Sequence, residues 1–194
     1  VYLPALWQGF IWDDDQYVTQ NPNLDDFAGL WRIWFSPAAS PQYYPFVFTS
    51  FWIEKKFWHL DPAGFHAVNV LLHATSVVLV WRLLGRLAVP GAWWAAALLA
   101  VHPVHVESVV WITERKNVLS GALYLTTMLA MLAWTRAVEG PDEELGETPQ
   151  ELATRKAAAR RSYVLALFAF GGALLSKSVT ATFPAAFLLL RWMQ

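Results

Sequence analysis

The chain has 194 residues, of which 56% are hydrophobic and 15% are charged, whereas soluble domains usually carry ~25% charged residues. This deficit favours a protein that folds in a membrane. The net charge of -1 argues against a nucleic-acid partner, and the absence of Cys excludes disulfides, thiolate nucleophiles and Cys-ligated zinc.

The first residues are apolar and lead into a run of acidic residues. We interpret residues 1–12 as the end of a first membrane helix that begins outside the sequence. Asp13, Asp14 and Asp15 follow at the point where the chain leaves the membrane. Three adjacent carboxylates repel one another, which raises the pKa of at least one of them and makes it a candidate general base. The alternative is a solvated loop that only ends the helix.

Residues 13–64 form a polar and aromatic stretch that we interpret as an outer loop. Within it, the segment 46–58 groups aromatic residues around Glu54, Lys55 and Lys56. This pattern predicts an amphipathic helix that lies in the plane of the membrane interface. The alternative is a packed helix of a luminal domain.

Residues 65–134 contain three uncharged apolar runs, and a membrane-spanning helix needs ~20 mainly apolar residues. The runs are Phe65 to Trp81, Leu87 to Val106 and Val118 to Thr135. Pro103 predicts that His102 ends a helix. The sequence therefore predicts three membrane helices here.

An acidic and then basic segment, 135–161, follows without an apolar period, and we interpret it as a solvated cytoplasmic linker. The last apolar region, 162–192, contains a single charge before its end, Lys177. It is either one long helix or a hairpin that turns at Ser176 to Ser178. We favour the hairpin, because a lysine facing lipid is costly and a turn places it at an aqueous edge.

A second polar cluster lies between two of the apolar runs and supplies acids, cations and amides. Its members are His102, His105, Glu107, Glu114, Arg115, Lys116 and Asn117. We interpret Arg115 and Lys116, together with Lys177, as phosphate ligands; ion pairing with Glu107 or Glu114 is the alternative. The His102 and His105 pair is interrupted by Pro103, which argues against a metal site.

Alternation of the helices predicts that three polar clusters reach the same membrane face. These are Asp13 to Asp15, His102 to Asn117 and Ser176 to Ser178. Most of the cations next to helix ends fall on the opposite side, so the positive-inside rule places the aspartates at the periplasmic or luminal face.

Four strings carry a resemblance to a known family: GFIWDDDQYVTQNPNL, YYPFVFTSFWIEKKFWHLDPAGFHAVNVLLHA, HPVHVESVVWITERKNVLSGALYL and LLSKSVTATFPAAFLLL. They resemble the membrane half of the transmembrane and tetratricopeptide-repeat-containing proteins, which are multi-pass GT-C glycosyltransferases alongside the protein O-mannosyltransferases. The resemblance implies an all-α, multi-pass transmembrane bundle. It also implies a polyprenyl-phosphate-linked sugar donor, transfer to Ser/Thr hydroxyls of proteins, and Asp13 with Asp14 as the catalytic pair.

On this basis we expect a single inverting displacement without a metal or other cofactor. Asp13 takes the acceptor proton and Asp14 orients the acceptor or the base. His102 joins the phosphate ligands, and the acceptor pocket is formed by Asp15, His105, Glu107, Glu114 and Asn117. The expected location is a bacterial inner membrane or the endoplasmic reticulum membrane. The alternatives are a non-enzymatic anchor that presents a repeat domain, and a transporter or lipid flippase.

Overall fold

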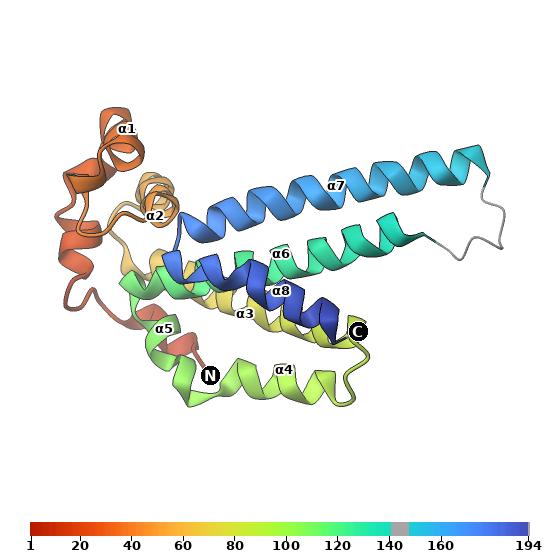
Figure 1. Ribbon diagram of the computed structural model, residues 1–194. Helices are drawn as coiled ribbons and strands as arrows, with labels where there is room; N and C mark the ends of the chain where they lie inside the picture. The colour runs from red at the N-terminus through yellow and green to blue at the C-terminus, as the bar shows by residue number, and fades with distance from the viewer. Residues whose placement is uncertain (141–147, 194) are drawn as a thin grey trace.

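The computed structural model describes residues 1–140 and 148–193, and every regular element within them is helical (Figure 1). The α-helices are α1 (Phe27–Phe35), α2 (Pro45–Trp58), α3 (Pro62–Arg86), α4 (Ala92–Val101), α5 (Val106–Val110), α6 (Arg115–Glu139), α7 (Pro149–Leu174) and α8 (Phe183–Trp192). The shorter turns are η1 (Leu3–Trp7), η2 (Asp15–Thr19), η3 (Pro22–Leu24), η4 (Pro37–Ala39), η5 (Pro103–His105), η6 (Ile112–Glu114) and η7 (Ser178–Thr182). The prediction of an all-helical protein is confirmed for these residues.

The long helices pack lengthwise against α6. Figure 1 shows α6 and α7 side by side and α4 below α3; α3 packs against both α4 and α6. Two helical stretches, α3 and Ile112–Glu139, are long and apolar enough to cross a membrane. The segment Ala92–Val101 with Pro103–Val110 makes a third if this pair, bent by 51°, is counted as one span. The described residues thus contain two or three candidate spans.

The N-terminal part of the chain folds into a compact cap, residues 10–61, at one end of the helices (Figure 1). Its core is apolar and continuous with the bundle, because the same cluster includes residues of α3 and η6. The buried members are Tyr17, Val18, Leu24, Ile33, Val47, Phe48, Phe51, Phe65 and Ile112. Burial of this cluster fixes the cap, and with it the aspartates, against the start of α6.

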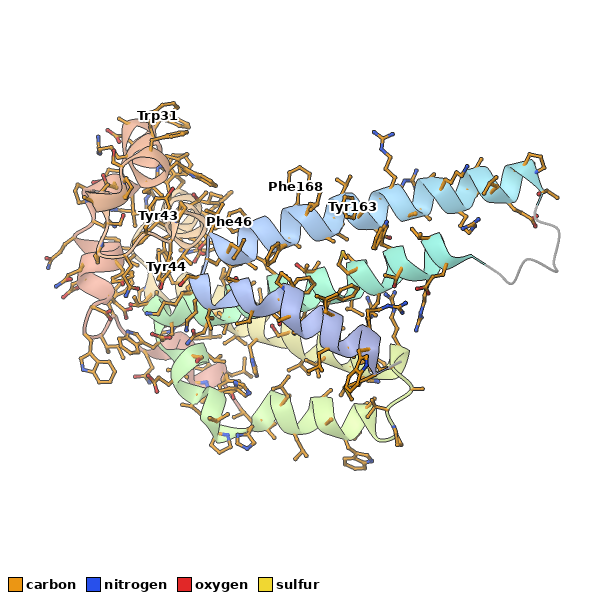
Figure 2. The ribbon with its side chains drawn as sticks, in the orientation of Figure 1. Trp31, Tyr43, Tyr44, Phe46, Tyr163 and Phe168 are labelled. Atoms are coloured by element: carbon orange, nitrogen blue, oxygen red, sulfur yellow. The ribbon has the colours of Figure 1, made fainter. Side chains whose placement is uncertain are left out.

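Helix α2 corresponds to the predicted segment 46–58 and begins one residue earlier, at Pro45. Val47, Phe48 and Phe51 are buried against the cap core, so one side of α2 is packed within the protein. Aromatic side chains nevertheless gather on the outside of the cap, where Figure 2 shows Trp31 and Tyr43, whereas Phe46 lies against α7 near Gly172. A position in the membrane interface stays a prediction.

The segment before the aspartates differs from the expected end of a membrane helix. Residues Leu3–Trp7 form one 3₁₀ turn, η1, and Gln8 is extended. Pro4 lies in the first turn and Gly9 follows shortly after its end. Proline lacks an N–H donor and glycine weakens helices, so these five residues do not continue as an α-helix.

Part of the predicted linker 135–161 is helical. α6 extends to Glu139, and α7 begins at Pro149, where Thr148 and Glu151 form a capping box. The remaining positions, 141–147, lie outside the described residues. α7 ends at Leu174, and the backbone at Lys177 is extended before η7 begins, so the chain turns at Ser176 to Ser178.

Arginines at the end of the bundle opposite the cap bind backbone carbonyls of neighbouring helices. Arg86 donates to the Leu129 carbonyl at 3.0 Å, and Arg136 donates to the Arg86 carbonyl at 2.8 Å. Arg155 donates to the Ala137 carbonyl at 2.7 Å. Cations at helix C-termini interact favourably with the unpaired carbonyls.

Candidate functional site

Asp14 is fully buried and connects the cap to the start of α6. Its Oδ2 accepts a hydrogen bond from Ile11 N at 2.9 Å, and its Oδ1 accepts from Thr113 N at 2.9 Å and from the Thr113 hydroxyl. Burial raises the pKa of Asp14, and these hydrogen bonds oppose the rise. Both of its oxygens are occupied, so Asp14 is placed to hold the loop rather than to meet a substrate.

Asp13 lies next to this anchor and is only partly buried. Its Oδ1 is buried and has no hydrogen-bond partner among the described residues. The preceding residue, Trp12, has a φ of 52°, a left-handed conformation that costs a bulky residue about 1–3 kcal/mol. Asp15 is exposed and accepts from the Thr19 hydroxyl at 2.8 Å. Of the three predicted aspartates, Asp13 is the one with an oxygen left unengaged and protected.

Tyr17 faces the carboxylates from η2, a π-helical turn, which is a conformation common at functional sites. Its ring stacks on Phe48, with ring centroids 5.3 Å apart. Burial, followed by electrostatic repulsion of the tyrosinate by Asp13, Tyr44 and Glu114, raises the pKa of Tyr17 to about 12. The phenol therefore remains a neutral O–H group, and Asp13 and Glu114 act on the same tyrosine from distant parts of the chain.

Arg115 is fully buried, and all five of its N–H donors are used within the protein. Nε donates to Asn69 Oδ1, and the terminal nitrogens donate to Ser50 Oγ at 3.1 Å, to the Phe65 carbonyl at 3.0 Å and to both oxygens of Glu54. Its guanidinium also lies 5.0 Å from the Phe51 ring centroid. No donor is left for a phosphate, and we therefore remove Arg115 from the predicted phosphate ligands.

The partner of Arg115 is Glu54 of α2, and neither Glu107 nor Glu114 takes this place. Burial raises the pKa of Glu54, while the adjacent Arg115 charge lowers it. The pair joins α2 to α6. Asn69 of α3 accepts a hydrogen bond from Arg115 and donates another to the Trp111 carbonyl at 2.9 Å, so α3 is joined to the same point. The buried pair and Asn69 thus hold α2 and α3 against the start of α6.

Asn117 is the centre of a second polar network. Its amide nitrogen donates to Ser108 Oγ at 3.0 Å and to Glu114 Oε2, and its Oδ1 accepts from the Lys177 ammonium. Glu114 also pairs with Lys116 at 2.8 Å. Lys116 Nζ lies 5.8 Å from the Tyr17 ring centroid, and Tyr17 N donates to the Asp13 carbonyl at 3.1 Å. Contacts therefore run from the backbone of the aspartate loop to the turn before η7.

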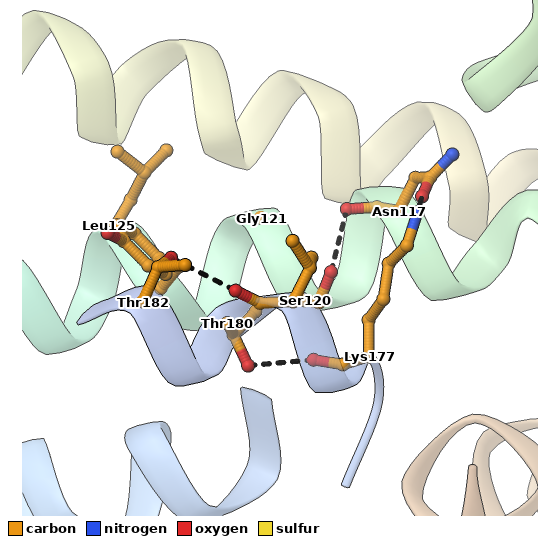
Figure 3. A pocket seen from close by; sticks show the side chains of 9 residues that line it. Asn117, Ser120, Gly121, Leu125, Lys177, Thr180 and Thr182 are labelled. Atoms are coloured by element: carbon orange, nitrogen blue, oxygen red, sulfur yellow. Dashed lines mark hydrogen bonds between the residues drawn. The ribbon is translucent and has the colours of Figure 1, made fainter. Parts of the chain in front are cut away.

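A cavity of about 360 Å³ opens beside Lys177. Figure 3 shows the Lys177 side chain directed at Asn117, with Ser120, Thr180 and Thr182 nearby. In the part of the chain that the structure describes, no carboxylate pairs with Lys177. An ammonium group held by a neutral amide at a cavity is suited to an anionic ligand.

The predicted histidines lie on the other side of this network. His102 is exposed, and its Nδ1 accepts from Val104 N at 3.2 Å. His105 is half-buried, with its ring centroid 5.3 Å from that of His73, and Glu107 is exposed. Across residues 1–140 and 148–193, no three His, Asp or Glu side chains group so as to hold a metal ion. Chemistry without a metal stays a prediction.

The structure therefore brings the three predicted polar clusters to one end of the bundle. The Asp14 to Thr113 contact joins the first cluster to the second, and the Lys177 to Asn117 contact joins the second to the third. The residues that our sequence analysis missed are Tyr17, Glu54, Ser108, Thr113, Ser120, Thr180 and Thr182. Apart from Glu54, these residues are uncharged. Glu54 is the one residue among them whose charge could have indicated an ion pair from the sequence.

Taken together, the fold and these contacts define a helical membrane protein with carboxylates and ammonium groups gathered beside a cavity at one end. No family model matches the chain, and no solved structure matches it. Curated relatives do match it. The chain is 32% identical over 143 residues to "Protein O-mannosyl-transferase tmtc2" of Xenopus laevis, covering 68% of this chain and 17% of that protein.

Two further relatives give the same result. The chain is 32% identical over 148 residues to "Protein O-mannosyl-transferase Tmtc1" of Drosophila melanogaster, and 28% identical over 158 residues to "Protein O-mannosyl-transferase TMTC3" of Homo sapiens. These matches cover 70% and 76% of this chain and 17% of each relative. The chain belongs to the transmembrane and tetratricopeptide-repeat-containing family, and it spans about a sixth of the length of these relatives.

Proposed function

We propose that the protein transfers a sugar, mannose or a related hexose, from a polyprenyl-phosphate carrier to Ser/Thr hydroxyls of proteins. The names of its relatives support glycosyl transfer to proteins. The observation that carries the proposal for this chain is the contact network from the Asp13 backbone through Tyr17, Lys116, Glu114 and Asn117 to Lys177. It places a carboxylate and an ammonium group at the same end of the bundle.

The reaction needs a base for the acceptor and a neutralised leaving group. In the proposed step, Asp13 takes the proton of the acceptor hydroxyl while the acceptor oxygen bonds to the anomeric carbon. The bond between that carbon and the phosphate oxygen breaks, its electron pair stays on the phosphate, and the configuration inverts. The unpartnered Oδ1 of Asp13 supports its role as the base. The three hydrogen bonds of Asp14 support a positioning role.

The leaving phosphate is proposed to lie near Lys177, with Lys116 adding positive charge and His102 and His105 adding hydrogen bonds. Electrostatic stabilisation of developing charge is often the largest catalytic contribution. Two or three cationic groups suffice for a monophosphate, so the proposal requires no metal. Asp15, Glu107, Glu114 and Asn117 are proposed to border the acceptor side, where Glu114 and Asn117 already bind each other.

We propose further that the chain is part of a multi-pass GT-C-type membrane domain, in a bacterial inner membrane or the endoplasmic reticulum membrane. The cap would then face the periplasm or lumen. Arg86, Arg136 and Arg155, which bind helix carbonyls opposite the cap, support this orientation, because cations next to membrane helices concentrate on the cytoplasmic side.

The test is to replace Asp13 by Asn in the intact protein and to measure transfer from a polyprenyl-phosphate sugar to a Ser/Thr peptide. We expect a loss of about 100-fold or more, the usual contribution of a positioned base. Asp25→Asn, at an exposed aspartate of the cap that pairs with Lys55, is the matched control and should retain activity. Activity of Asp13→Asn within a fewfold of the parent would refute the base assignment.

A further inference from the structure

Trp12 and Asp13 are the two central residues of one tight turn. The Ile11 carbonyl accepts a hydrogen bond from Asp14 N at 3.0 Å, and the Asp14 carboxylate accepts one from Ile11 N at 2.9 Å. Consecutive Cα atoms are about 3.8 Å apart, so the Trp12 ring and the Asp13 carboxylate leave this turn from neighbouring backbone positions. A molecule whose hydroxyl reaches Asp13 therefore lies within reach of the Trp12 side chain.

The backbone at Trp12 is an unfavourable place for a large side chain. Its φ of 52° lies in the left-handed region, which glycine adopts without strain. The ring does not fill the interior of the cap, because Trp12 is 76% exposed. Residues held in such conformations cluster at active sites and at sites that clamp ligands. The strain and the exposure together point to an indole that contacts a ligand.

The exposed ring of Trp12 is supported by the segment that leads into α6. Trp12 contacts Trp111 at a steep angle, with ring centroids 4.8 Å apart and ring planes 77° apart. The Trp111 carbonyl accepts from the Asn69 side chain at 2.9 Å, and Trp111 N donates to the Glu107 carbonyl at 3.1 Å. Trp111 is thus held in place on both sides of its peptide backbone. The Trp12 ring therefore has a fixed support, while its exposure leaves apolar ring surface open to solvent.

The open ring surface belongs to the acceptor side of Asp13. In the proposed function the donor phosphate lies near Lys177, and Trp12 lines neither the cavity there nor one of about 350 Å³ beside His73 and His105. The acceptor, in contrast, must bring its hydroxyl to Asp13. Successive residues of an extended peptide are about 3.3–3.6 Å apart, which matches the step from Asp13 to Trp12. The residue next to the reacting hydroxyl therefore passes over Trp12.

We propose that Trp12 is a specificity-determining residue that packs against an apolar side chain next to the reactive Ser/Thr of the acceptor protein. This inference rests on the proposed function and adds to it a preference for the acceptor sequence. An indole offers a large, rigid apolar surface with little rotamer freedom to lose. An acidic neighbour of the hydroxyl is disfavoured as well, because Asp13 and Asp15 carry charge of the same sign.

The test compares two fluorescein-labelled peptides that differ only beside a central threonine, Gly-Leu-Thr-Leu-Gly and Gly-Gly-Thr-Gly-Gly. Fluorescence anisotropy measures their binding to the intact protein in detergent, without a transfer step. We expect the parent to bind the leucine peptide at least tenfold more tightly and Trp12→Gly to abolish this difference. Trp12→Gly also relieves the left-handed backbone, so its Tm should stay close to that of the parent. The matched control is Trp7→Ala, at a tryptophan of η1 that is 79% exposed, which should keep the preference.

Two binding results would overturn the proposal. A preference for the leucine peptide that persists in Trp12→Gly would show that Trp12 does not read the acceptor. An equal loss of the preference in Trp12→Gly and Trp7→Ala, or a fall in Tm that parallels the loss of binding, would assign Trp12 a general role in anchoring or folding.

Transfer from a polyprenyl-phosphate sugar, measured on the same preparations, separates this inference from the proposed function. In Trp12→Gly, kcat/KM for the leucine peptide should fall at least tenfold, while KM for the donor stays unchanged. A parent that prefers the leucine peptide but transfers no sugar would refute the proposed function and leave the role of Trp12 in peptide binding standing. A parent that transfers sugar equally well to both peptides would refute the role of Trp12 alone.

Discussion

The carboxylate of Asp14 accepts hydrogen bonds from both the backbone N–H and the hydroxyl of Thr113, a residue 99 positions away. This contact sets the position of the adjacent Asp13 relative to the start of α6. The orientation of the candidate base is therefore determined by a buried aspartate and not by the local turn alone.

Asp14→Asn should change how stability depends on pH. The pKa of Asp14 is raised in the folded state, chiefly by burial. Its contribution to stability is thus fully present below the pKa of the unfolded chain and is lost as pH rises through the folded value. In the Asp14→Asn variant this decline should disappear. Because an amide N–H₂ would face a donor, we also expect a loss of about 1–3 kcal/mol at neutral pH, measured by denaturation in detergent. If the stability of Asp14→Asn depended on pH in the same way as that of the parent, a raised pKa of Asp14 would be contradicted.

Arg115→Met should destabilise the protein by about 3–5 kcal/mol, because it leaves the buried Glu54 without its charged partner. Removing both members, with Glu54→Leu and Arg115→Met together, should recover much of this loss. The measurement is the free energy of unfolding of the two single variants and the double variant. If the losses of the single variants simply add, the two residues do not act as a pair.

Lys177→Met should reduce transfer from the lipid-linked sugar while leaving the amount of protein in the membrane unchanged, because its ammonium group lies at a cavity and is held there by the neutral amide of Asn117. The control is Lys156→Met in α7, an exposed lysine that lines none of the cavities described above. Initial rates at several donor concentrations, with immunoblots of the membrane fraction, distinguish the two effects. Equal loss of rate and of protein would indicate a structural role for Lys177.

Gly29→Ala should destabilise the cap. Alanine favours a helix by about 1 kcal/mol over glycine, but a Cβ at Gly29 would lie 2.3 Å from the backbone carbonyl oxygen of Asn23. Moving a packed backbone costs about 1–3 kcal/mol, so the steric effect should prevail and lower Tm. Gly9→Ala, where an added Cβ meets nothing within 4 Å, provides the comparison. A rise in Tm for Gly29→Ala would mean that α1 can shift away from Asn23.

Tyr17, the buried tyrosine of the cap, should ionise only well above the ordinary pKa of tyrosine. Its pKa is raised to about 12 by burial and by electrostatic repulsion of the tyrosinate by Asp13, Tyr44 and Glu114. The folded protein holds the phenol proton, so this contribution to stability is complete below about pH 10 and falls as pH approaches the raised value. Ultraviolet titration of the parent and of Tyr17→Phe should differ only above about pH 10. If Tyr17→Phe instead removed an ionisation near the ordinary pKa of tyrosine, the raised pKa of Tyr17 would be contradicted.

The sequence was sufficient to predict the helical class, the helix 46–58 and the turn at Lys177, because apolar runs and isolated charges are local signals. It was also sufficient to predict that the three polar clusters lie at one end of the bundle, because successive long helices were expected to alternate in direction. That this end is a membrane face stays a prediction. The division of roles between Asp13 and Asp14 could not be predicted, since it depends on which carboxylate meets Thr113.

Arg115 shows a second limit of the sequence. A cation at the end of an apolar run was interpreted as a phosphate ligand, whereas Glu54 and Asn69 occupy it from separate helices. Which anion pairs with a given arginine depends on tertiary packing, and residues 61 positions apart carry no local sign of that pairing. Residues 149–161 were assigned to a linker because they lack an apolar period, although the Thr148 capping box and an alanine-rich run favour a helix.

The distant partners of Asp14 and Glu54 also affect how the protein is made. During translation, both carboxylates emerge long before Thr113 and Arg115, which bind them. Until the ribosome has delivered the start of α6, the nascent cap has two acidic side chains without their native partners and cannot complete its interior. We therefore expect a stalled chain that ends before residue 112 to remain protease-sensitive throughout the cap, and a chain that extends beyond α6 to become resistant.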